Sequence, residues 1–408
     1  MSSGGRRYPW EVAEGMRRSL LHFGFLLACL AVVLVLASCV VPSPPVPPTP
    51  TRNPSPTTSP PKTTATPSPP PTSKTVAPTT KTAPSPSTPA TPHSPSIKLE
   101  SVGDTASKAG EKITCLFEWK HKGCSWWYEA TLSNSLYQYY RERPRIQVED
   151  WAVYPTHPGN DWLTKGLAEV IQRDAPKLGY QPYDIVECAV VFAQSIPYTL
   201  DADSKGKSEY PRFPIETVVE RTGDCEDHAI LLAAVTRALG YDTILLNFPT
   251  HIAVGIAGDP SIRGTYYEHR GKQFYYVETT STGWKIGQVP EKFRGVSAKV
   301  IELTPKPVFY CRWSYPSWQG YIPVNVTVEN RGSLAADGVV VHAGCDAGSD
   351  KVWNQMKTSS FSIPVDQKAT VQLSLVPPRG QHTRVVVWVT EGDRTVHKSY
   401  SDQWFDTK

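Results

Sequence analysis

Residues 42–97 restrict the fold of this 408-residue chain most, because they cannot form a hydrophobic core. The segment consists almost entirely of Pro, Ser, Thr and Ala and holds 20 of the 39 prolines. This composition offers too little apolar surface to offset the entropy lost on ordering, and proline keeps the chain extended. We therefore expect a disordered linker, with a short segment before it and a foldable part of about 310 residues after it.

The first 41 residues predict export and a membrane anchor. Arg17 and Arg18 precede an apolar run over residues 23–36, and small residues follow it in Leu36-Ala37-Ser38-Cys39. A charged start, an apolar middle and small residues are typical of a signal peptide. The ending also resembles a bacterial lipobox, in which Cys39 would be lipidated. A transmembrane helix over residues 23–41 is the alternative, and both put the rest of the chain outside the cytoplasm.

The charge of the foldable part excludes nucleic acid as a partner. Eight of the 42 Lys and Arg residues and two of the 38 Asp and Glu residues precede residue 97, which leaves 34 basic and 36 acidic residues. Binding to nucleic acid needs Lys and Arg clustered on one face. The sequence contains no such cluster.

The foldable part divides into two predicted domains. Residues 98–304 mix helical and strand patterns, whereas residues 305–408 are predicted to be strands throughout. Alternating runs such as 324–330 and 384–389, with turn signals between them, predict a β-sandwich of immunoglobulin-like type. We expect an α+β fold, in which helices packed on an antiparallel sheet are followed by this all-β domain.

The first domain is expected to contain three helices and then three strands. Apolar spacing and caps predict helices over 161–178, 183–195 and 225–239, the second of them buried because it is apolar on nearly all sides. The period then changes to that of strands, at 243–248, 251–257 and 274–278.

The third predicted helix begins with the segment Gly223-Asp224-Cys225-Glu226-Asp227-His228. Asp224 is the expected N-cap, with Asp227 three residues later. Cys225 therefore lies in the first turn, where free N–H groups and the helix dipole stabilise a thiolate. A buried and inert cysteine is the alternative, because free cysteines are common core residues.

His251 and Glu278 are the predicted partners of Cys225. A cysteine nucleophile needs a base, and the base needs an anion or an amide to orient it. His251 begins one strand and Glu278 ends the next, so antiparallel pairing can bring them together. His228 is an alternative base, because it lies three residues after Cys225 on the same helix face.

These segments resemble the transglutaminase-like superfamily, whose fold is papain-like, and its secreted prokaryotic members most closely. The resemblance rests on residues 223–227, on His251 in His-Ile-Ala-Val-Gly, and on Tyr276-Val277-Glu278-Thr279-Thr280 followed by Trp284. It extends over roughly residues 160–295. It implies that the chain is an enzyme with a catalytic cysteine.

The resemblance also implies individual roles. Cys225 would be the nucleophile, His251 the general base and acid, and Glu278 the third member of the triad. The family most often has aspartate at that last position, but no aspartate lies nearer than Asp259, which falls in a predicted turn. We therefore expect Glu278 to serve.

Further residues are candidates for supporting roles. Gln194 could donate a hydrogen bond to an oxyanion, although an amide at a helix end also satisfies local backbone groups. The backbone N–H of Cys225 is the other oxyanion donor, and Asp224 supports it as the cap. Trp284 and Tyr198 are weak candidates for walls of a substrate cleft or for core residues.

The remaining cysteines fit an oxidising compartment. We expect Cys115 to pair with Cys124 and Cys311 with Cys345, and Cys188 to be a buried free thiol. Zinc bound by Cys115, His121 and Cys124 is an alternative, but the spacing fits no common zinc motif. We expect no metal and no cofactor.

Together, these patterns predict a membrane-tethered, extracytoplasmic cysteine enzyme. Cys225 would attack an amide or peptide carbonyl and form a thioester, which water or an amine releases. Hydrolysis is favoured because only a minority of the superfamily crosslinks, and the substrate would be a protein, a peptide or the cell wall. A cell-surface binding module and a structural surface protein whose cysteine has lost its role are the alternatives.

Overall fold

The computed structural model describes residues 95–101, 111–258, 262–316 and 320–408. The predicted anchor with Cys39, most of the predicted linker and Asp259 lie outside the described residues. No helix within these ranges is long and apolar enough to cross a membrane.

The first part of the described chain begins with a hairpin of β2 (Lys112–His121) and β3 (Cys124–Ser133). Lys122 and Gly123 join the two strands, and both have positive φ, as a tight two-residue hairpin turn requires. Alternate side chains of the hairpin, among them Trp119 and Trp126, are buried. The hairpin therefore packs one face against the helices that follow.

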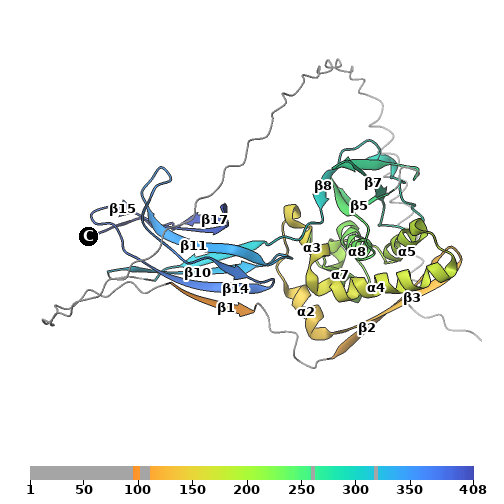
Figure 1. Ribbon diagram of the computed structural model, residues 1–408, viewed down its shortest axis with the longest axis horizontal. Coiled ribbons are helices and arrows are strands. Elements are labelled where there is room, and N and C mark those ends of the chain that lie inside the picture. The colour runs from red at the N-terminus through yellow and green to blue at the C-terminus, as the bar shows by residue number, and fades with distance from the viewer. Residues whose placement is uncertain (1–94, 102–110, 259–261, 317–319) are drawn as a thin grey trace, which may run out of the picture. The chain divides into compact units, whose positions relative to one another are not determined.

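A helical region over residues 134–238 follows the hairpin (Figure 1). Its α-helices are α2 (Asn134–Glu142), α3 (Val153–Thr156), α4 (Asp161–Asp174), α5 (Pro182–Gln194), α6 (Asp201–Ser204), α7 (Pro214–Glu220) and α8 (Cys225–Ala238). The 3₁₀ turns are η1 (Val148–Asp150), η2 (Pro158–Asn160) and η3 (Pro176–Leu178). The α-helix predicted over 161–178 ends at Asp174, because Pro176 cannot continue an α-helix.

Helix α8 lies at the centre of this region. It packs against α3, α4, α5 and α7 and against strands β4 and β5 (Figure 1). From Glu226 to Thr236 every residue of α8 is buried. Because α8 is enclosed on all sides, its N-terminus has a fixed position relative to the sheet.

An antiparallel five-stranded sheet packs on α8. Its order is β6-β7-β5-β4-β8, formed by β4 (Thr243–Phe248), β5 (His251–Ala257), β6 (Tyr266–His269), β7 (Lys272–Val277) and β8 (Lys299–Glu302), and η4 (Glu291–Phe293) precedes β8. Val254 of β5 lies opposite Val277 of β7. The start of β5 and the end of β7 therefore lie next to each other at the same end of these strands.

The C-terminal region contains only strands, in two main antiparallel sheets that share one apolar core. The first sheet has the order β1-β14-β10-β9, from β1 (Ser96–Ser101), β14 (Gln367–Leu375), β10 (Ile322–Asn330) and β9 (Phe309–Ser314). The second has the order β12-β11-β16-β17, from β12 (Val352–Lys357), β11 (Ala336–Asp346), β16 (Val385–Glu391) and β17 (Arg394–Tyr400). Strand β13 (Phe361–Ile363) pairs with β11, and β15 (His382–Thr383) pairs with β18 (Phe405–Asp406).

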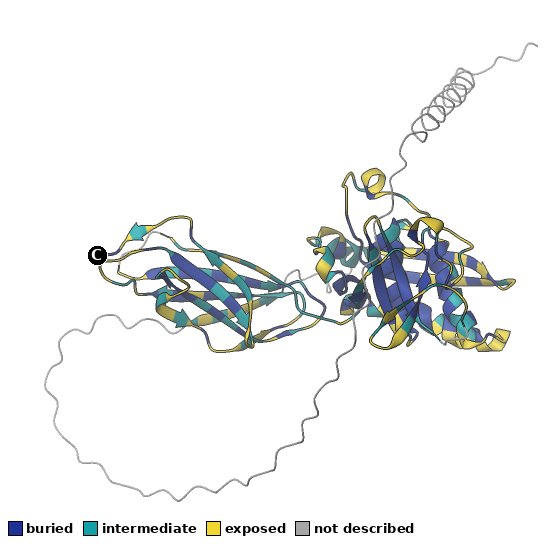
Figure 2. Cartoon of the chain, turned by 90° about the horizontal axis from the view of Figure 1, so that it is seen from above, coloured by how far each residue is buried: buried dark blue, intermediate teal, exposed yellow. Residues whose placement is uncertain are grey.

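Buried residues alternate with mostly half-buried residues along strands such as β10 and β14 (Figure 2). The buried residues of β10 are Ile322, Val324, Val326, Val328 and Asn330. The α+β class and the all-β C-terminal region predicted from the sequence are confirmed.

One domain boundary differs from the prediction. Residues 98–101 were expected to begin the first domain, but β1 pairs with β14 along its whole length, from Ser96 opposite Gln372 to Ser101 opposite Gln367. The strand therefore belongs to the C-terminal region. Its partner lies about 270 positions later in the chain, so no local pattern could assign it.

The predicted disulfides are absent from the structure. Cys115 lies opposite Ala130 and Cys124 opposite His121, so the two cysteines are six residues apart along the hairpin, about 20 Å, and cannot pair. Cys311 and Cys345 are on different sheets and are both free thiols. Cys188 is buried and free, as predicted.

Candidate active site around Cys225

Cys225 is the first residue of α8, and Asp224 is its N-cap. The side chains of Asp224 and Asp227 each accept a hydrogen bond from the other's backbone N–H, and Asp224 N donates to Asp227 Oδ2 at 3.2 Å. This is a reciprocal capping box made by two aspartates. It fixes the turn that presents the cysteine.

Gly223 fits this turn because it has no side chain. A Cβ at this position would lie 2.5 Å from Cβ and 2.8 Å from Oδ2 of Asp227. Asp227 is fully buried and cannot move aside.

We therefore expect Gly223→Ala to lower the free energy of unfolding by about 1–3 kcal/mol, the usual cost of overpacking. Urea denaturation would measure this loss. An unchanged midpoint would show that the cap tolerates a methyl group and that the glycine has another role.

His251 and Glu278 lie side by side where β5 begins and β7 ends. His251 Nε2 is 3.1 Å from Glu278 Oε2; His251 begins β5 as predicted, whereas Glu278 directly follows β7, which ends at Val277. The imidazole ring stacks on Phe293, with the ring centroids 4.7 Å apart and an interplanar angle of 8°. The carboxylate and the phenyl ring together fix the orientation of the imidazole.

Glu278 is held by four further donors. Tyr276 Oη donates to its Oε2 at 2.7 Å, and its Oε1 accepts from Thr280 Oγ1 at 2.7 Å and from the backbone N–H groups of Thr279 and Thr280 at 3.1 Å each. Burial alone would raise the pKa of Glu278, but the hydrogen bond and charge of His251, with those of Thr280 and Tyr276, lower it to about 2. The carboxylate is therefore charged at any pH of interest.

His251 carries the opposite shift. Burial alone would lower its pKa, but hydrogen bonds with Cys225 and Glu278 and the charges of these two groups raise the pKa of His251 to about 9. The imidazole is thus a stable cation at neutral pH, next to the sulfur of Cys225. The structure brings Cys225, His251 and Glu278 together in this order.

His228 does not lie on an open helix face. It is fully buried, and its Nδ1 donates to the carbonyl of Thr279 at 3.0 Å. Burial lowers the pKa of His228, so the ring is neutral. It ties α8 to the segment after Glu278, which leaves His251 as the histidine placed to act as a base.

Gln194 has a different role from the one proposed for its amide. Its Nε2 donates to the carbonyls of Glu278 and Trp284, at 2.8 and 2.9 Å. Both amide hydrogens are therefore used, and none remains for an oxyanion. Gln194 instead anchors the segment that follows β7.

Tyr198 and Trp284 are partly exposed. Tyr198 is 45% exposed, and burial of its hydroxyl, with the nearby charge of Cys225, raises the pKa of Tyr198 to about 12. Trp284 Nε1 donates to Ser281 Oγ at 3.0 Å. Neither residue belongs to the core. Tyr198, which lies close to Cys225, therefore remains a candidate for a wall of the substrate cleft.

A buried ion network supports the turn before Cys225, and the sequence did not predict it. Arg212 is fully buried and pairs with Asp201 Oδ1 and Glu220 Oε2 at 2.8 Å each, and with Asp227. Its Nη2 also donates to Ser204 Oγ at 2.7 Å. Because Asp227 forms the capping box, Arg212 supports the turn that holds Cys225.

Near Cys225, two groups of side chains have potential ligand atoms that lie close enough to one another to hold a cation. Asp224 groups with Cys225 and Glu226, and also with Asp201 and Asp227. Asp224 Oδ1 and Glu226 Oε1 are buried without a hydrogen-bond partner. Burial, followed by the nearby carboxylate of Asp224, raises the pKa of Glu226 far above its usual range, and Glu226 Oε2 is 3.3 Å from Cys225 Sγ.

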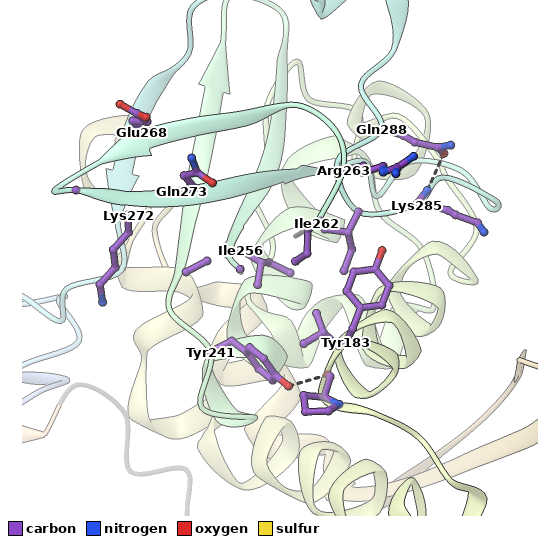
Figure 3. A pocket seen from close by; sticks show the side chains of 16 residues that line it. Tyr183, Tyr241, Ile256, Ile262, Arg263, Glu268, Lys272, Gln273, Lys285 and Gln288 are labelled. Carbon is purple, nitrogen blue, oxygen red and sulfur yellow. Dashed lines mark hydrogen bonds between the residues drawn. The ribbon is translucent and has the colours of Figure 1, made fainter. Parts of the chain in front are cut away.

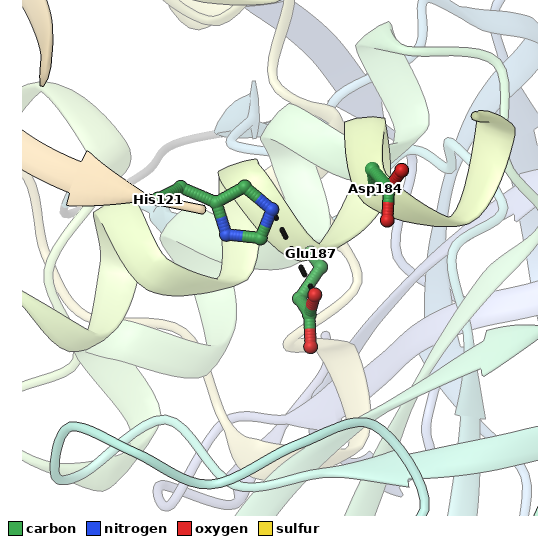
Figure 4. A group of neighbouring side chains, drawn as sticks. All are labelled: His121, Asp184 and Glu187. Carbon is green, nitrogen blue, oxygen red and sulfur yellow. Dashed lines mark ion pairs between the residues drawn. The ribbon is translucent and has the colours of Figure 1, made fainter. Parts of the chain in front are cut away.

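A third group lies where β2 meets α5 (Figure 4). His121 Nε2 is 3.7 Å from Glu187 Oε2, and Asp184 lies nearby. Asp184 is already used, because its Oδ1 pairs with Lys122 at 2.6 Å and its Oδ2 accepts from Gln181 N at 2.9 Å. The zinc alternative fails, because Cys115 lies six residues along β2 from His121.

A pocket of about 1250 Å³ lies elsewhere on the sheet (Figure 3). Tyr183, Tyr241, Ile256 and Ile262 contribute to its wall. It opens at the end of β5 opposite to His251, and neither that residue nor Cys225 or Glu278 lines it. It is therefore separate from the candidate active site.

Comparisons with known proteins add little. No family model and no curated protein matches the chain. Among solved structures, a DUF3823 family protein from Bacteroides ovatus is similar, with 14% identity, a TM-score of 0.19, and coverage of 41% of this chain and 88% of that one. A β-glucosidase from Kluyveromyces marxianus is similar over 25% of this chain and 15% of its own, with 15% identity and a TM-score of 0.17. TM-scores this low carry no argument about fold or function.

Proposed function

We propose that the chain is a transglutaminase-like cysteine enzyme that transfers acyl groups at amide or peptide bonds. The observation that carries the proposal is the pairing of His251 with Glu278 at 3.1 Å, with the same imidazole interacting with Cys225 at the start of α8. A cysteine at a helix N-terminus beside a cationic histidine is the arrangement that activates a thiol.

The surrounding fold supports the same proposal. A central helix that carries the cysteine and packs on an antiparallel sheet that carries the histidine and the acid is consistent with a papain-like core. The two C-terminal sheets with their common core are consistent with an immunoglobulin-like sandwich.

The proposed reaction has two steps. The sulfur of Cys225 attacks the carbonyl carbon, the C–N bond breaks, and His251 gives its proton to the leaving amine. Water then attacks the thioester while His251 takes a proton from it, and the carboxylic acid is released. Glu278 stays ionised and stabilises the imidazolium. The backbone N–H of Cys225 is the proposed oxyanion donor, because the amide of Gln194 is committed elsewhere.

We further propose hydrolysis as the main outcome and a protein, peptide or cell-wall component as the substrate. The predicted anchor and linker would place the enzyme outside the membrane. Mass spectrometry tests this proposal by comparing the surface proteins of cells that carry the wild type with the surface proteins of cells that carry Cys225→Ala. New N-termini would report hydrolysis, and incorporated amines would report crosslinking. Identical profiles would favour a binding module without catalysis.

The charge of Glu278 should be visible in the titration of His251. We expect the His251 ring to titrate near pH 9 in the wild type and at a lower pH in Glu278→Gln, because the carboxylate raises this pKa. Histidine side-chain NMR across pH 5–10 would measure both values. The titration of His342, in β11 of the C-terminal region, is the internal control and should not change. An unchanged His251 titration would remove Glu278 from the triad.

A further inference from the structure

A second candidate site lies within the C-terminal region. Residues 313–316, at and beyond the end of β9, and residues 399–404, at and beyond the end of β17, line a groove of about 870 Å³. We call it the aromatic groove. Its lining contains no residue of the candidate active site, so an inference about it stands whether or not Cys225 reacts.

The aromatic rings of the groove have fixed orientations. Trp313 and Tyr315 are nearly parallel, with an interplanar angle of 17° and centroids 6.1 Å apart. Trp313 is held by a hydrogen bond of 2.7 Å from its Nε1 to Ser399 Oγ. Both rings also pack against the core of the C-terminal region.

Trp404 offers the most exposed ring of the groove. It is 47% exposed, and it stacks on His382 with centroids 5.2 Å apart and an angle of 8°. Arg384 lies over both Tyr400 and Trp404, at 4.3 and 4.8 Å from the two ring centroids. These contacts fix the orientation of the ring, so little flexibility is lost when a ligand contacts its exposed part.

Polar groups lie between these aromatic rings. Ser314, Asp402 and Gln403 are exposed, and among the described residues no hydrogen bond or ion pair engages the side chains of Asp402 and Gln403. The turn that carries them is ordered, since Ser401 Oγ donates to the carbonyl of Gln403 at 3.0 Å and accepts from Val385 N at 3.0 Å. The groove thus combines preformed apolar faces with free hydrogen-bonding groups.

We propose that the aromatic groove binds a neutral glycan built of β-linked pyranoses, such as glucose or N-acetylglucosamine. Pyranoses with equatorial hydroxyls have apolar C–H faces that stack on aromatic rings, and hydroxyls at their edges that bond to carboxylate, amide and hydroxyl groups. Ligand pockets typically measure about 300–1,000 Å³, so the groove has room for several sugar rings.

A neutral glycan fits this lining better than a proline-rich peptide does. Peptides in the polyproline conformation use parallel aromatic ridges and few side-chain hydrogen bonds. Here a carboxylate, an amide and a hydroxyl stand among the rings. The unpaired carboxylate of Asp402 also disfavours an anionic sugar.

Titration calorimetry of the full chain in detergent tests the proposal, with cellohexaose, chitohexaose and a proline decamer as probes. We expect one of the hexaoses to bind and Trp404→Ala to weaken it by about tenfold. Tyr315→Ala and Asp402→Asn should also weaken binding, whereas Trp127→Ala, which removes a tryptophan that is 64% exposed on β3, should not.

Cys225→Ala should bind the hexaose like the wild type, because the groove lies apart from Cys225. Three results would overturn the proposal. They are no binding of either hexaose at millimolar concentrations, binding that Trp404→Ala leaves unchanged while the variant keeps the wild-type melting temperature, and binding of the proline decamer alone.

Discussion

Replacing His251 with alanine is expected to slow alkylation of Cys225 by iodoacetamide at pH 6 by about one to two orders of magnitude. The pKa of His251, raised to about 9, keeps the imidazole cationic at this pH and next to the sulfur. An ordinary thiol, with a pKa near 8.5, is less than about 1% thiolate at pH 6. Part of the gain from a larger thiolate fraction is offset, because a more acidic thiol is a weaker nucleophile.

His269→Ala is the matched control for this experiment. His269 also lies in the five-stranded sheet and also pairs with a glutamate, Glu302, but it lies opposite Lys272, at the end of β7 that is remote from Glu278. Its replacement should leave alkylation of Cys225 within about twofold of the wild type. Equal rates for His251→Ala and His269→Ala would show that His251 does not activate the cysteine.

Replacing Arg212 with methionine is expected to lower the free energy of unfolding by about 3–5 kcal/mol. The guanidinium is fully buried and compensates three carboxylates, those of Asp201, Glu220 and Asp227. Burial raises the pKa of Asp227, and the charge of Arg212 opposes this shift, so without the arginine the cost of burying the carboxylate is no longer offset. Urea denaturation at pH 7 would measure the loss.

Two further variants separate the burial of charge from the loss of a long side chain. Arg173→Met removes an exposed arginine that pairs with Asp174 at 2.5 Å, and it should leave the urea midpoint close to that of the wild type. Arg212→Met combined with Asp227→Asn should recover part of the loss, because one of the uncompensated charges is then gone. A single variant as stable as Arg173→Met would contradict the role given to the network.

The parts of the site that local chemistry determines could be predicted from the sequence. The glycine, the capping aspartates and the apolar run that follows them define the start of α8, and short continuous apolar runs define β5 and β7. The pairing of β5 with β7 brings His251 and Glu278 together as expected, although β6, which the sequence did not predict, lies between these two strands in the chain.

The remaining parts depend on contacts between distant segments. Gln194 was a plausible oxyanion donor until its amide was found on two carbonyls about 85–90 residues away. Arg212 gave no signal, because a buried arginine can be recognised only once its carboxylates are in place around it. Strand β1 was misassigned for the same reason, since its partner β14 is remote in the chain. Cys115 and Cys124 were misassigned because the register of their hairpin, and not their spacing in the sequence, sets the distance between them.

Site-resolved alkylation of the native protein tests the central claim most directly. The protein is treated briefly with iodoacetamide at pH 6.5, quenched, and mapped by mass spectrometry. Burial raises the pKa of Cys188 and Cys311 to about 12, that of Cys345 to about 11, and that of Cys115 as well, so these thiols should react slowly. We predict that Cys225 is labelled well before Cys124 and Cys311, the other two partly exposed cysteines of the described chain. Labelling of Cys124 at the same rate as Cys225, or faster, would contradict the assignment of Cys225 as the nucleophile.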